Sequence, residues 1–87
     1  MIGARQIKAA RALAGLSQRD VATRAGIGIA TMRRIEAAID EVTGSAQTLV
    51  RIQKALESEG MRFIDQDDQG GPGVRMRKPL PSKRMKT

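Results

Sequence analysis

Residues 17–36, SQRDVATRAGIGIATMRRIE, decide the fold of this 87-residue chain. Ser17 is followed three residues later by Asp20, a spacing that resembles a capping box, with Asp in place of the usual Glu or Gln. The pattern predicts one helix over about residues 18–25 and a second over about 29–38. Gly26 stands between them, where the chain must turn and where a positive φ is easiest for glycine.

The apolar residues of this stretch predict two helices that cross closely around a short turn. Ala22 supplies the small side chain that is needed where the second helix passes the first. The residues expected to turn inward are Val21, Ala22, Ala25, Ile27, Met32 and Ile35, whereas Arg33 and Arg34 are left outside. A single Gly or Ala would mean little, but the complete pattern indicates a helix-turn-helix.

The flanking sequence predicts two more helices. Upstream, between Arg5 and Leu16, helical spacing and the stop residue Gly15 define a helix whose apolar positions are Ile7, Ala10, Leu13 and Ala14. Residues 39–44, IDEVTG, are expected to form a loop. Ser45 then caps a helix to about Glu59, with an apolar face of Leu49, Ile52, Ala55 and Leu56. The prediction is a mainly α, compact four-helix domain over residues 1–60.

The pattern changes after Gly60. Residues 61–65, MRFID, and 73–77, GVRMR, alternate apolar and polar side chains, although Ile64 breaks strict alternation in the first. The turn-rich stretch 66–72 separates them. Two short strands are expected, either as a β-hairpin or as strands exchanged with a second chain, which makes residues 61–78 a possible dimerisation element. Phe63, the only aromatic residue, is expected in the core. Residues 79–87 have the composition of a basic flexible tail.

Composition excludes several function classes. The chain has no Cys and no His, which rules out zinc held by Cys and His, and imidazole acid–base catalysis. The acidic residues lie in expected loops and on an exposed helix face, so no catalytic site, metal site or cofactor is predicted. No apolar run approaches the roughly 20 residues that span a membrane, and a cytoplasmic protein is expected.

The charge of the chain is unevenly distributed. Residues 1–35 carry a net charge of +6, residues 36–73 carry −5, and residues 74–87 carry +6 without any acid. This asymmetry suggests one half that faces a polyanion and a basic tail, although a solvated surface with a solubilising tail is the alternative.

The stretch LSQRDVATRAGIGIATMRRIE, residues 16–36, resembles the helix-turn-helix of the Cro/phage-repressor (XRE-like) family of transcriptional regulators. The resemblance extends over about residues 5–58 and is carried by the opening LSQ, the Ala22/Gly26 pair and the closing RIE. It implies a lambda-repressor-like fold in a bacterial or phage-type, nucleoid-associated protein that binds double-stranded DNA, usually as a homodimer on a palindrome. It also implies that Gln18 meets the DNA backbone and braces the recognition helix, and that Arg11 pairs with Glu36.

The residues expected at the DNA are Ser17, Gln18, Gly28, Ile29, Ala30, Thr31, Arg33, Arg34 and Ser45. The sequence departs from the family at residues 28–30, where a capping Ser and polar side chains are frequent. Ile29 and Ala30 could contact thymine methyl groups, which leaves polar readout to Thr31 and the two arginines. Each arginine could read guanine or clamp phosphate. At Ser45, a plain helix cap is favoured over direct contact.

A second function is compatible with the same pattern. An antitoxin or antiactivator uses such a fold to hold a partner protein, and the apolar Ile29 and Ala30 motivate this alternative. The C-terminal strands and tail would then make the protein contact.

Overall fold

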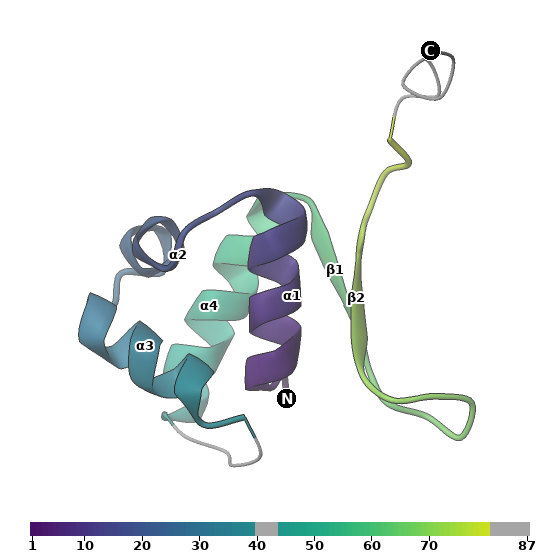
Figure 1. The fold of residues 1–87 in the computed structure, drawn as a ribbon, viewed down its shortest axis with the longest axis horizontal. Coiled ribbons are helices and arrows are strands. Elements are labelled where there is room, and N and C mark those ends of the chain that lie inside the picture. Colours follow the sequence, from purple (N-terminus) through teal and green to yellow (C-terminus); the bar gives the residue numbers. More distant parts are fainter. Residues whose placement is uncertain (40–43, 81–87) are drawn as a thin grey trace.

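The computed structural model describes residues 1–39 and 44–80. In these ranges the chain forms four helices followed by a two-stranded antiparallel hairpin (Figure 1). The elements are α1 (Ala4–Ala14), α2 (Gln18–Ala25), α3 (Ile29–Ala37), α4 (Ala46–Ser58), β1 (Met61–Ile64) and β2 (Gly73–Met76). The predicted mainly α fold class is confirmed. The part of the expected loop at residues 40–43 and most of the expected tail, residues 81–87, lie outside the described ranges.

Local sequence signals fix where α2 begins and where it ends. The Ser17 hydroxyl accepts a hydrogen bond from the Asp20 amide at 3.0 Å, and the Asp20 carboxylate accepts one from the Ser17 amide at 2.9 Å. The predicted capping box is therefore present. Gly26 follows α2 with φ of +71°, a left-handed conformation in which an L side chain is strained.

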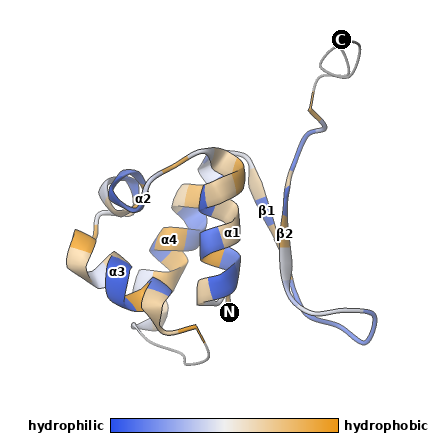
Figure 2. Cartoon of the chain, viewed as in Figure 1, coloured by the Kyte–Doolittle hydropathy of each residue, from blue (hydrophilic) through white to orange (hydrophobic). Residues whose placement is uncertain are grey.

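The core lies where α1, α2, α3 and α4 meet. Figure 2 shows apolar and polar residues interspersed along α1, α3 and α4, and the apolar ones supply most of the buried side chains. Five of the six inward positions predicted for the helix-turn-helix are buried, namely Val21, Ala22, Ala25, Met32 and Ile35, and Ile27 is partly buried against them. Of the apolar positions of the first helix, Ile7 and Ala10 are buried and Ala14 is partly buried, whereas 43% of Leu13 is exposed. Helix α1 contacts the hairpin as well as the other helices, and Leu13 lines an open groove with Val74 and Met76 of β2.

The hairpin forms within one chain, so of the two arrangements expected from sequence the structure has the intramolecular one. Phe63 pairs with Val74 and Met61 with Met76 in antiparallel register. These apolar side chains pack against the helical core, and Met61 is almost completely buried. A lone two-stranded ribbon is marginal in water, so this packing accounts for its stability.

A buried glutamine joins the hairpin to the first helix. The Gln6 amide nitrogen donates to the Ile64 carbonyl at 3.1 Å and to the Gly73 carbonyl at 2.9 Å, and its amide oxygen accepts from the Gly3 amide at 3.1 Å. Ile64 and Gly73 are paired at the end of the ladder. Sequence analysis missed Gln6, because its acceptors are backbone carbonyls 58 and 67 residues away.

Candidate nucleic-acid interface

The exposed side of α3 is formed by Ala30, Arg33, Arg34 and Ala37. These residues are spaced by three, four and seven positions, which places them on one face of the helix. Neither arginine makes an ion pair or a side-chain hydrogen bond with another described residue. Two guanidinium groups are therefore available to an external anion, and the small alanines beside them allow a close approach.

The beginning of α3 is open but only partly solvent-facing. Gly28 caps the helix without a side-chain hydrogen bond, and a Cβ added there would meet no heavy atom within 4 Å. Ile29 packs partly against the core, and Thr31 is half-buried. Only part of the Ile29 side chain can therefore reach a base, whereas Ala30 is exposed.

The opposite side of α3 carries a buried carboxylate that joins three helices. The Glu36 side chain is 2% exposed and accepts from Arg11 Nε at 2.6 Å and from Arg11 Nη2 at 2.8 Å. The Arg11–Glu36 pair implied by the family resemblance is confirmed. The hydrogen bond to Glu36 is the main cause that raises the pKa of Arg11, and partial burial opposes it. This bidentate geometry fixes α3 to α1.

Gln18, the first residue of α2, completes this network. Its amide nitrogen donates to Glu36 Oε1 at 3.1 Å. The beginning of α2 is thereby held beside the end of α3, so the bracing that the resemblance implies is present. The Gln18 side chain is half-buried, and its contact with the DNA backbone stays a prediction.

The hydroxyl groups of the two capping serines are already engaged. Ser17 caps α2, and its capping box holds the pKa of Asp20 below the ordinary value, mainly through the hydrogen bond from the Ser17 backbone. The Ser45 hydroxyl accepts from the Thr48 amide at 3.1 Å at the beginning of α4. The cap favoured for Ser45 is therefore present, and a phosphate contact by either serine stays a prediction.

This arrangement, with α2 and α3 crossing at a glycine turn and exposing a basic face of α3, defines a helix-turn-helix domain, a fold that suggests DNA binding. A family model described as a helix-turn-helix domain matches residues 4–60. The chain belongs to this family, which is part of the XRE-like helix-turn-helix group, as the sequence resemblance suggested. No curated protein matches the chain.

The described residues also bear on membrane crossing and on metal binding. Within residues 1–39 and 44–80, no helix combines the length and apolarity required to cross a bilayer. In the same ranges, acidic residues do not gather in groups of three or more that could hold a metal ion.

Proposed function

We propose that this protein is a sequence-specific transcriptional regulator that inserts α3 into the major groove of DNA, as a homodimer on a palindromic operator. The observation that carries this proposal is the pair of arginines on the exposed face of α3, neither of which has an ion-pair or side-chain hydrogen-bond partner among residues 1–39 and 44–80. A buried network holds the other side of the same helix, so the exposed face is presented in a fixed orientation. Such preorganisation lowers the cost of binding.

In this proposal the two arginines of α3 have different roles at the DNA. One guanidinium donates to O6 and N7 of a guanine, which gives specificity, and the other binds a phosphate, which sets the position of the helix. Ala30 and the exposed part of Ile29 contact thymine methyl groups, and Thr31 adds a polar contact. Gln18 and the amides at the beginnings of α2 and α4, next to Ser17 and Ser45, hold backbone phosphates.

The proposed dimer contact is the apolar part of the C-terminal segment, residues 61–78, together with the adjoining side of α1. An open groove of about 310 Å³ there is lined in part by Leu13, Val74, Met76 and Leu80. Leu13 and Leu80 are 43% and 55% exposed. Apolar side chains gathered at one groove favour coverage by another chain. Two recognition helices about 34 Å apart would then enter successive major grooves.

Selection of bound duplexes from a random pool tests the proposal, with the mass of the complex giving its stoichiometry. An operator with two-fold symmetry and two protein chains is the expected result. Arg33→Ala and Arg34→Ala should each weaken binding, and the base-reading one should relax specificity at one position by about 1–3 kcal/mol. Arg51→Ala, an exposed arginine on α4, is the matched control. If Arg33→Ala and Arg34→Ala both bind the operator like the parent protein, α3 does not read the DNA.

The same apolar groove supports one alternative, a protein-binding module of the antitoxin or antiactivator type. Its distinguishing results are a stoichiometric protein that co-purifies with the chain and the absence of any selected duplex. Substitution of Leu13 by Asp would then release the partner protein, whereas in the leading proposal it separates the two copies of this chain.

A further inference from the structure

We infer that the outer face of the hairpin is a second DNA-binding surface, which holds a DNA segment other than the one bound by α3. The inference rests on the proposed DNA-binding function of α3. The surface consists of Arg62 on β1 and Arg75 on β2, and it continues at the base of the hairpin into Arg77 and Lys78, which follow β2. We call these four residues the cationic strip.

The register of the hairpin places like charges directly opposite each other. Arg62 pairs with Arg75, between the inward-facing pairs Met61–Met76 and Phe63–Val74. Both arginines are exposed. The Arg77 amide donates to the Gly60 carbonyl at 2.8 Å, which continues the pairing and puts Arg77 on the same face as Arg75. Like charges opposite each other destabilise a sheet, so this face is not arranged for the stability of the isolated protein.

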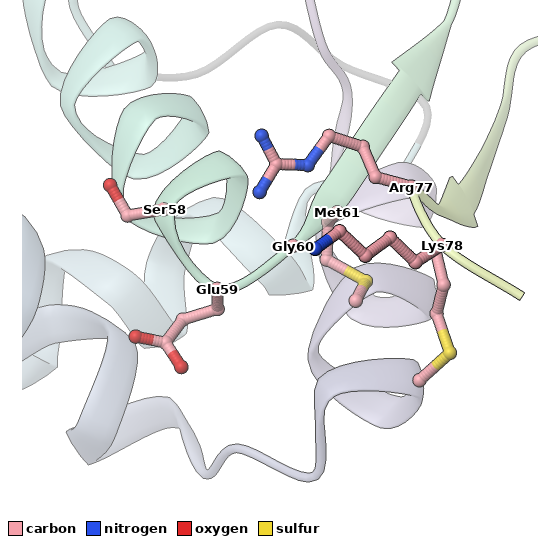
Figure 3. A pocket seen from close by; sticks show the side chains of 7 residues that line it. Ser58, Glu59, Gly60, Met61, Arg77 and Lys78 are labelled. Carbon is pink, nitrogen blue, oxygen red and sulfur yellow. The ribbon is translucent and has the colours of Figure 1, made fainter. Parts of the chain in front are cut away.

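No acid in the described part of the chain neutralises the strip. None of its four side chains makes an ion pair or hydrogen bond with another described residue. An open pocket of about 370 Å³ lies at the base of the hairpin, and Arg77 and Lys78 line it together with Glu59. Figure 3 shows that the Glu59 carboxylate points away from Arg77 and Lys78. Glu59 instead pairs with Arg24 of α2 at 3.6 Å.

Phosphates fit the strip better than carboxylates of a second copy. Three of its four side chains are arginines, whose planar groups donate in pairs to phosphate oxygens. Three residues of the strip, Arg75, Arg77 and Lys78, belong to the segment 74–87, which carries six cations and no acid. A polyanion relieves the repulsion between Arg62 and Arg75, which face each other across the hairpin. A protein already held on DNA also meets other DNA segments at high local concentration.

The strip and α3 lie on different sides of the molecule. The hairpin packs on α1 and α4, whereas α3 packs on α1 and α2. In Figure 1, α1 stands between α3 and the hairpin. A DNA segment seated on α3 therefore leaves the strip free for another segment, so that the protein bridges two.

A co-capture assay tests this inference. The full chain is mixed with a fluorescent operator duplex and a biotinylated duplex of unrelated sequence, and the fluorescence retained on streptavidin is measured over a salt series. The parent protein should retain the fluorescent duplex. Arg62→Gln/Arg75→Gln should reduce retention by about tenfold and lower the salt slope of second-duplex binding by about 2. Its operator binding should persist, and its melting temperature should be no lower than that of the parent.

Arg51→Gln/Lys54→Gln removes the same charge from exposed positions of α4 and should retain co-capture. Equal loss in both double variants, or no loss in the hairpin variant, overturns the inference. A lower mass of the DNA-free hairpin variant also overturns it, because the strip would then bind acids at the hairpin turn of a second copy. The double variant Arg33→Ala/Arg34→Ala separates operator binding by α3 from duplex binding by the strip, because it should lose the first and keep the second. Should the parent find no operator while the strip still captures duplex, the proposed function alone fails.

Discussion

Removal of the Arg11 side chain is the sharpest test of how the buried network holds α3. Arg11→Met leaves the Glu36 carboxylate buried, with 2% of its side chain exposed, and removes two of its three hydrogen bonds. Only the Gln18 amide, at 3.1 Å, remains. Breaking a buried pair from one side costs about 3–5 kcal/mol, because an uncompensated charge stays behind.

That cost is a large share of the stability expected for a chain of this length, about 4–13 kcal/mol. The melting temperature should fall by at least about 12 °C. The chain has no Trp and no Tyr, so urea unfolding is best followed by far-UV circular dichroism rather than by intrinsic fluorescence.

The double variant Arg11→Met/Glu36→Leu shows whether the loss comes from the stranded charge. Well-packed apolar replacements of a buried pair are often neutral or stabilising, so the double variant should recover most of the loss and lie within about 1–2 kcal/mol of the parent. The control is Arg24→Met, which removes the 3.6 Å pair with the half-exposed Glu59 and should cost less than about 1 kcal/mol. Additive losses in the double variant, or a single-variant loss no larger than that of Arg24→Met, would refute the reasoning.

Two further predictions concern the hairpin and the α2 cap. Gln6→Met leaves the Ile64 and Gly73 carbonyls without their donor and should cost about 1–3 kcal/mol. Amide exchange should show lost protection in β1 and β2, while Gln53→Met, which removes only a bond to Glu57 in α4, leaves the hairpin protected. The Asp20 pKa is lowered in the folded protein, so its cap stabilises fully above the ordinary pKa of 3.8 and is lost as pH falls through the lowered value. Urea midpoints of the parent and Asp20→Ala should therefore differ at neutral pH and converge in acid, and a constant difference would contradict this linkage.

The helical part of the fold could be predicted from sequence because its signals are local. The α2 prediction, residues 18–25, coincides with the observed bounds, since Ser17, Asp20 and Gly26 act within a few residues of the helix they delimit. The exposure of Arg33 and Arg34 followed from a 3.6-residue period that already buries Met32 and Ile35. The Arg11–Glu36 pair came from the family resemblance rather than from spacing.

Only the tertiary structure decided the features that depend on distant parts of the chain. Sequence alternation allowed a hairpin or exchanged strands, and in the structure β1 and β2 pair as a hairpin that packs on α1 and α4. The same packing buried Gln6, whereas Leu13 stays exposed beside β2. Register alone placed Arg62 opposite Arg75, since a shift of one strand by one residue would move one of the two arginines to the other face. Caps and periodicity determine where a single helix or strand lies. Contacts between residues far apart in sequence depend on how the finished elements pack to bury their apolar surfaces.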